Sequence, residues 1–282
     1  MKIGLIDVDG KMPNLALMKL SAFHKACGDE VTWYDPLFGG FDKVYASKVF
    51  DFSADYGYWP DYCEIERGGT GYDLRSKIAP EAEGCSPDYS IYPKCEYSLQ
   101  LFSRGCIRAC EFCVVPEKEG RIRGVDAMDL NPKGKHIEVL DNNFFGHKGW
   151  ESAVGWLQKA GQPVSLHGVD ARILTRSHAD ALNSLKHIKQ IHIAWDDHNA
   201  DLRPKLREIA TWIKPYKLMC YVLIGFGSTE EQDLWRVESL REIGIDPYVM
   251  AMDKDEYYQH RFQRWVNHKA IWKTVKWKDY RK

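Results

Sequence analysis

The feature that most constrains the fold of this chain is a regular alternation of apolar strand-like and helix-like segments through its central part. Consecutive strands joined by helices pair in parallel, so the series predicts an α/β fold. Six strands at roughly 26 residues per unit favour a partial, open (β/α)6 barrel, because a complete eight-unit barrel needs about 250 residues. The predicted strands are Tyr97–Phe102, His136–Leu140, Pro163–Leu166, Gln190–Trp195, Lys217–Ile224 and Asp246–Met250, and the predicted helices are Trp150–Ala160, Ser177–Leu185, Arg203–Trp212 and Thr229–Ile243.

A smaller α/β unit precedes this series. A helix that opens at Pro13-Asn14 and stops near Gly28 separates two predicted strands, which is typical of a Rossmann-like layer. The two strands are Lys2–Val8 and Glu30–Tyr34, with weaker candidates at Lys43–Phe50 and Tyr62–Glu66. We therefore predict a Rossmann-like domain over residues 1–95, the partial barrel over residues 96–255, and a basic, aromatic helix or tail over residues 256–282.

Composition and charge exclude some classes of function. Lys and Arg together number 39, and Asp and Glu number 40, so the formal net charge is -1. Overall charge therefore does not drive the chain onto DNA or anionic lipid, and any such binding needs a local patch. The sequence contains no run of about 18 apolar residues, which a transmembrane helix would need. The first residues turn acidic at Asp7 without the apolar stretch of a signal peptide, so we expect a cytoplasmic protein that does not bind membranes.

The strongest chemical signal is a cluster of three of the eight cysteines in the loop after the first barrel strand. Cys106, Cys110 and Cys113 follow the spacing C-x3-C-x2-C, and three thiolates on one short loop can hold a soft metal centre. A four-iron cubane normally takes four cysteines, so three leave one iron open to a non-protein ligand. A closed zinc site needs a fourth ligand, and residues 100–120 contain no histidine and no cysteine beyond these three. The spacing favours an open iron–sulfur site over structural zinc or unligated thiols.

With Phe112 before its last cysteine, this motif resembles the signature of the radical S-adenosylmethionine (radical SAM) enzymes, and the resemblance covers about residues 96–253. It implies the partial (β/α)6 barrel, a [4Fe-4S] cluster on the three cysteines, and S-adenosylmethionine (SAM) bound at the open iron beside Phe112. In that family a one-electron reductant of the flavodoxin or ferredoxin type supports cleavage of SAM. The resulting 5′-deoxyadenosyl radical abstracts a hydrogen atom from the substrate.

The same resemblance implies SAM-binding roles for residues at the ends of later strands. The segment Asp141-Asn142-Asn143 resembles one found in the methylthiotransferase and cobalamin-type branches. Barrel enzymes place their sites at these strand ends, although helix caps and turns favour the same residue types. The candidates are Asp141 and Asn142 for the SAM amino group, Arg172 for its carboxylate, Asp196 or Asp197 for the ribose hydroxyls, and Gly225 beside the adenine.

The N-terminal unit resembles the cobalamin-binding domain that precedes some radical SAM barrels, but it departs at the cobalt ligand. The D-x-H-x-x-G motif is absent, because residues 7–12 contain no histidine. We therefore expect no cobalamin and a degenerate domain that shapes the substrate pocket. The loop Gly68-Gly69-Thr70-Gly71 is expected to point toward the barrel mouth, either as a phosphate cradle or as a simple turn.

Two further patterns leave alternatives open. Four polar residues lie on or beside predicted strands: His136, Glu138, His167 and His192. They either line the lumen as acid–base groups or are core residues whose polar atoms are satisfied by hydrogen bonds. The tail from Glu256 onward carries eight Lys and Arg against two acids. Its aromatic residues favour either stacking against a nucleic acid or an amphipathic helix that closes the barrel with a solvated basic face.

The predicted function is hydrogen abstraction by a radical SAM enzyme that modifies a nucleic acid or nucleotide. Modification of a peptide or small metabolite is the nearest alternative. A third hypothesis is a non-enzymatic module in which a metal ion stabilises the cysteine loop and the basic tail binds nucleic acid. It predicts zinc rather than iron, and intact SAM.

Overall fold

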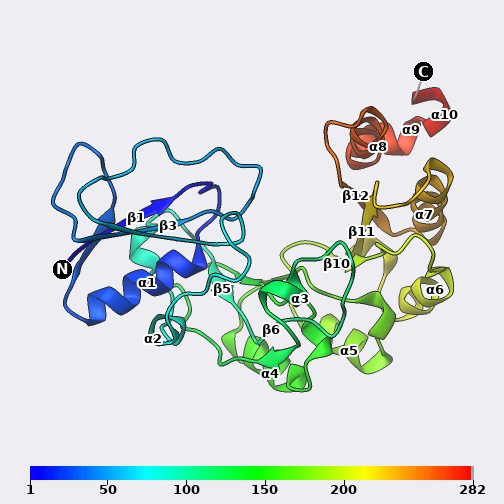
Figure 1. Cartoon of the computed structure of the whole chain (residues 1–282). Coiled ribbons are helices and arrows are strands. Elements are labelled where there is room, and N and C mark those ends of the chain that lie inside the picture. Colours follow the sequence, from blue (N-terminus) through cyan, green and yellow to red (C-terminus); the bar gives the residue numbers. More distant parts are fainter. Residues whose placement is uncertain (281–282) are drawn as a thin grey trace.

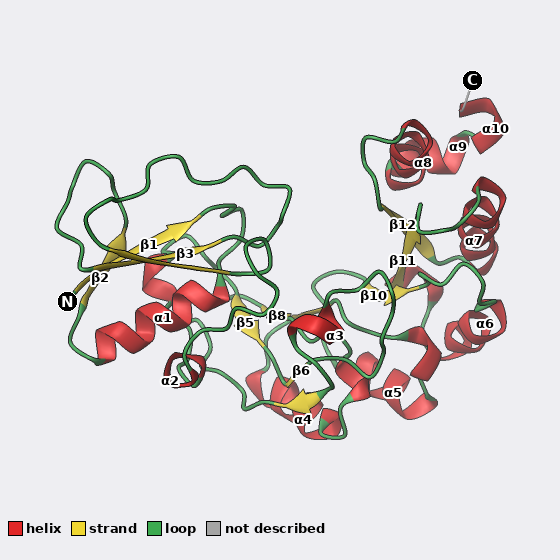
Figure 2. Ribbon diagram, viewed as in Figure 1, coloured by secondary structure: helices red, strands yellow, loops and turns green. Residues whose placement is uncertain are grey.

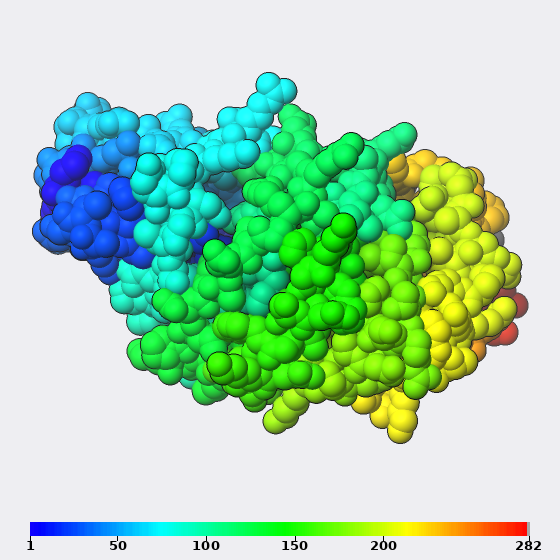
Figure 3. All heavy atoms as spheres, turned by 90° about the horizontal axis from the view of Figure 1, so that it is seen from below, coloured from blue at the N-terminus to red at the C-terminus, as the bar shows by residue number. Residues whose placement is uncertain are grey.

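The computed structural model describes residues 1–280, which form a mixed α/β structure with parallel sheets (Figure 1, Figure 2). Arg281 and Lys282 of the predicted basic tail lie outside the described residues. Figure 3 shows the N-terminal part at one end of the molecule, packed against the central part. Among the described residues, no helix combines the length and apolar character needed to cross a membrane.

The N-terminal unit is a four-stranded parallel sheet with the order β2-β1-β3-β4. Its first helix begins after Asn14, whose side chain accepts hydrogen bonds from the backbone N–H groups of Ala16 and Leu17. The predicted strand–helix–strand unit is confirmed, and both weaker strands are present. The elements are β1 (Lys2–Asp7), α1 (Leu15–Ala26), β2 (Glu30–Trp33), β3 (Lys43–Ser47), β4 (Glu64–Gly68) and α2 (Pro80–Glu83).

The six strands predicted for the central part are all present, in two parallel sheets with the orders β5-β8-β9 and β10-β11-β12. A parallel bridge between Val169 and Ile193 joins the end of β9 to β10. The strands therefore follow one another in space as they do in the chain. Their bounds are β5 (Ser98–Gln100), β8 (Ile137–Val139), β9 (Val164–Leu166), β10 (Ile191–Ala194), β11 (Leu218–Ile224) and β12 (Asp246–Ala251).

Helices α4 to α7 lie along an arc on the outer side of these strands, and α3 lies inside the arc (Figure 1). Alternate strand residues face opposite sides of a sheet. In β8, Ile137 and Val139 therefore pack in the same core as Leu157 of α4, whereas Glu138 faces inward. The remaining elements are β6 (Ser103–Arg104), α3 (Val115–Lys118), β7 (Arg123–Gly124), α4 (Trp150–Ala160), α5 (Arg176–Ser184), α6 (Arg203–Trp212), α7 (Glu230–Ile243) and 3-10 turns at Tyr89–Ile91, Phe144–Gly146, Ala171–Ile173 and Pro215–Lys217.

The described C-terminal tail consists of three short helices, α8 (Tyr257–Asn267), α9 (Lys269–Thr274) and α10 (Trp277–Tyr280). The predicted helical spacing breaks at His268, whose ring accepts a hydrogen bond from the N–H of Ile271 and so starts a new helix. Four large aromatic residues of the tail are buried in the main core, so their rings do not face a nucleic acid, whereas Tyr257 is exposed. The four buried residues are Phe262, Trp265, Trp272 and Trp277.

The loops that follow β8 and β9 cross at Gly168, whose carbonyl accepts a hydrogen bond from Phe144 N–H at 2.8 Å. A Cβ atom there would lie 1.9 Å from the carbonyl oxygen of Asp141. We predict that Gly168→Ala lowers the free energy of unfolding by about 3 kcal/mol or more, because the backbone must move apart.

Urea denaturation checks this prediction, and Gly155→Ala is the matched control. Gly155 lies on the exposed face of α4 with open space around it. Alanine should stabilise that helix by roughly 0.5–1 kcal/mol. Equal effects of the two substitutions would contradict the crossing as described.

Candidate metal centre

The loop that carries the three cysteines is closed at its base by glycine geometry and by Glu119. Gly105 has φ +79°, and a Cβ atom there would lie 2.5 Å from the carbonyl oxygen of Arg121. The Gly105 N–H donates to a Glu119 carboxylate oxygen at 2.8 Å, and Cys106 N–H donates to the Gly120 carbonyl. The two ends of the loop therefore meet immediately before the first cysteine.

The three thiols of this loop are free and half-buried. Burial raises the pKa of the Cys113 thiol, and the charges of the neighbouring Cys110 and Cys106 raise it further. The three sulfurs therefore lie near enough to interact. Among the described residues, no three His, Cys, Asp or Glu side chains are gathered as ligands around one metal ion, so metal binding by the loop stays a prediction.

Asp141 braces the chain just before this loop. It is 3% exposed, and its carboxylate accepts hydrogen bonds from Phe102 N–H at 3.0 Å and from the Ser103 hydroxyl at 2.5 Å. Burial raises its pKa. Both oxygens are thus used within the protein, and Asp141 holds the start of the loop against the end of β8.

The two asparagines after Asp141 have different surroundings. Asn142 is exposed and donates to Glu119 at 2.8 Å, so it contacts the base of the cysteine loop. Asn143 is buried, and its amide nitrogen lies 3.8 Å from the Cys106 sulfur and 3.4 Å from Asp170. Its buried Oδ1 has no hydrogen-bond partner among the described residues. The sequence prediction stopped at Asn142, although the third polar residue of the same run was the available signal.

Arg172 and its partner Asp170 lie beside the cysteine loop. The guanidinium donates to Asp170 from Nε at 2.7 Å and from Nη2 at 3.1 Å. Arg108 of the loop donates to the same carboxylate at 3.0 Å. Burial alone would raise the pKa of Asp170, but the two arginines outweigh it and lower the pKa. The pKa of Arg172 is raised by Asp170 and also by the Cys110 thiol. The Arg172–Asp170 pair therefore lies close to the cysteine loop.

Asp196 reaches the loop from the end of β10. Burial raises its pKa, and its charge in turn raises the pKa of Cys113. Its neighbour Asp197 is exposed and accepts the N–H of Asn199 in a turn. The structure thus separates the two candidates for ribose binding: the Asp196 carboxylate accepts a hydrogen bond from Leu223 N–H at 3.2 Å and lies near enough to Cys113 to raise its pKa, whereas Asp197 caps a turn.

A fully buried ion pair holds Asp196 in position. Arg236 of α7 pairs with Asp233 at 2.6 Å, and both side chains are 0% exposed. The same guanidinium donates to the carbonyl oxygens of Trp195, Asp196 and Leu223. These carbonyls lie at the carboxyl ends of β10 and β11. A buried charge is tolerated only when such partners satisfy it, so the network fixes both strand ends.

Phe112 and Gly225 meet through Phe226. The rings of Phe112 and Phe226 pack edge to face with their centroids 5.6 Å apart, which joins the cysteine loop to the loop after β11. Gly225 has φ +82°, and a Cβ atom there would collide with Gln259 at 2.1 Å. Of the predicted positions, Arg172 and Asp196 lie near enough to act on the cysteine thiols, Asn142 contacts the base of the loop through Glu119, and Gly225 adjoins the Phe226 ring that packs on Phe112.

A chain of polar side chains crosses the inner face of the strands. Glu138 accepts a hydrogen bond from His167 at 2.8 Å and lies 3.1 Å from His136. His167 in turn lies 3.0 Å from His192, and the two rings stack. Burial would raise the pKa of Glu138, but its histidine and serine partners lower it to about 2. Burial lowers the pKa of His192 to about 4. These residues are satisfied polar groups that line the inner face.

Comparisons of the chain with protein-family models and with curated proteins find no match.

We predict that Glu138→Gln lowers the free energy of unfolding by about 1–3 kcal/mol at pH 7, because it removes a partly buried carboxylate from its hydrogen bonds. The pKa of Glu138 is lowered from its ordinary value of 4.5, so its stabilisation is present above pH 4.5 and is lost as the pH falls toward 2. The difference between wild type and variant in urea denaturation should narrow over that interval.

Glu96→Gln is the control, since Glu96 forms an exposed ion pair with Lys135. Its effect should stay under about 1 kcal/mol. A Glu138 effect that grows on acidification would contradict the assigned charge state.

Proposed function

We propose that this chain is a radical SAM enzyme, in which Cys106, Cys110 and Cys113 hold a [4Fe-4S] cluster. The observation that carries the proposal is three free thiols on one braced loop, at the carboxyl end of the first strand of a six-strand parallel series. Three cysteine ligands leave one iron of such a cluster open. The in-order strands with helices on their outer side support the partial (β/α)6 barrel that this family uses.

The residues around the thiols fit a cluster of this kind. Cys106 and Cys110 raise the pKa of the Cys113 thiol, so a bound cation would relieve the crowding of thiolates at this loop. The Asn143 amide lies next to the Cys106 sulfur, and hydrogen bonds to sulfur tune iron–sulfur clusters. When bound, the cluster supplies the electron that cleaves SAM to methionine and a 5′-deoxyadenosyl radical.

The chain's own residues bind and orient SAM in this proposal. Arg172 keeps N–H donors beyond the two that Asp170 accepts, and these suit the SAM carboxylate. Asp196 accepts hydrogen bonds from the ribose hydroxyls, and Phe112 with Phe226 forms an apolar wall. Because Asp141 is used as a brace, Asn142 is the remaining candidate for the SAM amino group.

We predict that the chain, reconstituted with iron and sulfide without oxygen, produces 5′-deoxyadenosine from SAM after reduction with dithionite. Cys110→Ala should abolish both the cluster absorbance and the product, because only two loop thiols remain. Chromatography of the products and iron analysis provide the measurement.

Cys85→Ala is the matched control, because Cys85 is a free cysteine outside the loop whose thiol donates to the Glu81 carbonyl. It should retain iron and activity. A colourless, zinc-loaded protein that leaves SAM intact would overturn the proposal in favour of the metal-stapled binding module.

Asp196 and Asp197 offer a neighbouring pair that tests SAM binding. We predict that Asp196→Asn weakens SAM binding by about tenfold or more, because a charged acceptor of the ribose hydroxyls is lost. Asp197→Asn should change the affinity less than about twofold, since Asp197 caps an exposed turn. Calorimetric titration of the reconstituted protein with SAM measures both, and the reverse order would assign the ribose contact to Asp197.

A further inference from the structure

A cavity of about 590 Å³ lies between the N-terminal unit and the base of the cysteine loop. One wall comes from the carboxyl edge of the N-terminal sheet, including Ser47 and the loop Gly68-Gly69-Thr70. The opposite wall includes Arg104, Glu119 and Asn142. Ligands of parallel α/β sheets bind outside the carboxyl ends of the strands, so this is the expected edge for a site. The volume falls within the usual range for small-molecule pockets.

The glycines of the 68–71 loop are explained by packing rather than by a ligand. Gly69 has φ +93°, and a Cβ atom there would lie 2.3 Å from the Lys48 carbonyl oxygen. A Cβ atom on Gly71 would lie 2.7 Å from the Phe50 carbonyl oxygen. The loop is therefore a tight turn against the segment after β3. The glycines therefore do not by themselves indicate a phosphate site.

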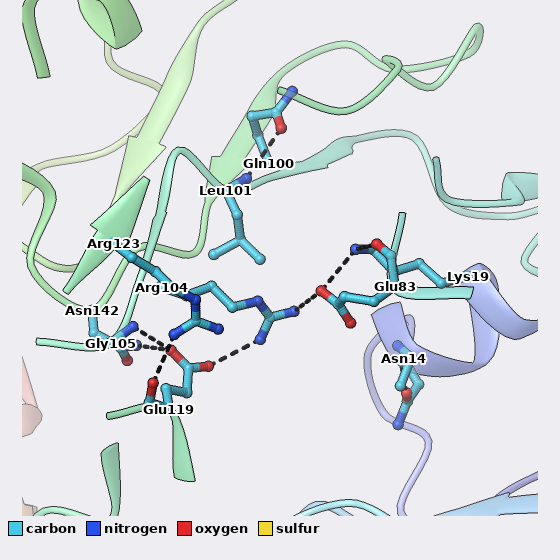
Figure 4. A network of polar contacts seen from close by, with 11 residues as sticks. Asn14, Lys19, Glu83, Gln100, Leu101, Arg104, Gly105, Glu119, Arg123 and Asn142 are labelled. Carbon is cyan, nitrogen blue, oxygen red and sulfur yellow. Dashed lines mark hydrogen bonds and ion pairs between the residues drawn. The ribbon is translucent and has the colours of Figure 1, made fainter. Parts of the chain in front are cut away.

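Every carboxylate that lines the cavity has a cationic partner. Arg104 lies between Glu83 and Glu119, with N···O distances of 3.1 and 3.0 Å (Figure 4). Glu83 also pairs with Lys19 at 3.0 Å. The third lining carboxylate, Glu66, pairs with Lys43. Lys19 and Arg104 thus balance the charges of Glu83 and Glu119, whereas Glu66 shares Lys43 with Glu64. The Glu83–Arg104–Glu119 bridge joins the N-terminal unit to the cysteine loop.

Three cations of the same walls lack a carboxylate partner among the described residues: Lys77, Lys118 and Arg123. Lys118 donates only to the carbonyl oxygens of Asp73 and Ser76, and Arg123 to that of Glu119. Burial lowers the pKa of Lys118. The nearby carboxylates of Asp73 and Glu119 favour its charged form, whereas the nearby cations Arg104 and Lys77 oppose it. The cavity therefore carries uncompensated positive charge beside the apolar side chains of Leu20, Ile78 and Leu101.

We propose that this cavity binds a phosphomonoester of nucleotide size, with its phosphate held by Lys77, Lys118 and Arg123 and its less polar body along Leu20, Ile78 and Leu101. A phosphate monoester carries about -1.5 to -2 charges at pH 7 and so matches several unpaired cations better than one carboxylate does. We identify this phosphomonoester as the substrate of the enzyme, and that identification rests on the proposed function. Asn142, a cavity residue and the candidate for the SAM amino group, joins the two sites.

Calorimetric titration of the full chain, without iron or SAM, tests the proposal. The probes are guanosine and uridine 5′-monophosphates, with guanosine and uridine as phosphate-free controls and citrate as a carboxylate probe. At least one nucleotide should bind about tenfold or more tightly than its nucleoside and than citrate. Lys77→Ala and Arg123→Ala, both at exposed side chains, should each weaken nucleotide binding by about tenfold. Lys133→Ala, at an exposed lysine outside the cavity, should leave it unchanged.

Nucleosides or citrate that bind as tightly as the nucleotides would overturn the phosphate assignment. So would the absence of nucleotide binding, or a Lys133→Ala loss as large as that of Lys77→Ala. Because this titration needs neither the cluster nor SAM cleavage, it can fail while the proposed radical chemistry stands. It can also succeed if the protein proves to hold no iron.

Discussion

The site depends first on one buried carboxylate, Asp141, which accepts hydrogen bonds from Phe102 N–H and the Ser103 hydroxyl. Hydrogen bonds to charged groups contribute about 1.5–3 kcal/mol each, and loss of this acceptor would leave a buried donor unpaired. The cysteine loop begins three residues after Ser103. Its position relative to β8 is therefore set by Asp141, while Gly105 and Glu119 close its base. Three thiols on an unbraced loop would sample many sulfur–sulfur distances. A preformed set of metal ligands needs those distances to vary little.

A second brace acts from the opposite side of the site. Arg236 and Asp233, both fully buried, tie the carboxyl ends of β10 and β11 to α7, and the Tyr258 hydroxyl of α8 donates to Asp233. Breaking a buried pair is costly because the remaining charge is left without a partner. The two braces hold different strand ends, and Asp196, at the second brace, lies near enough to Cys113 to raise its pKa. The tail contributes to this framework through its buried aromatic side chains, which explains why its sequence is rich in Trp.

Much of the fold could be predicted from local patterns. The helices Trp150–Ala160 and Arg203–Trp212 were predicted with their observed bounds, and every central strand was found, because periodicity and caps are local signals. The prediction was weaker where tertiary contacts decide. Nothing local distinguishes Asp141, a brace, from an exposed ligand, or Asp196 from Asp197. The burial of the tail aromatics and the unpaired charge of Lys77, Lys118 and Arg123 depend on segments far apart in the chain.

The central claim is that the cysteine loop holds an iron–sulfur cluster with one iron open to SAM. Electron paramagnetic resonance of the reconstituted, dithionite-reduced protein, recorded before and after addition of SAM, tests it most directly. We expect a reduced-cluster signal whose shape changes when SAM binds, because SAM would ligate the open iron. A protein with no such signal after reconstitution, or a signal that SAM leaves unchanged, would contradict it.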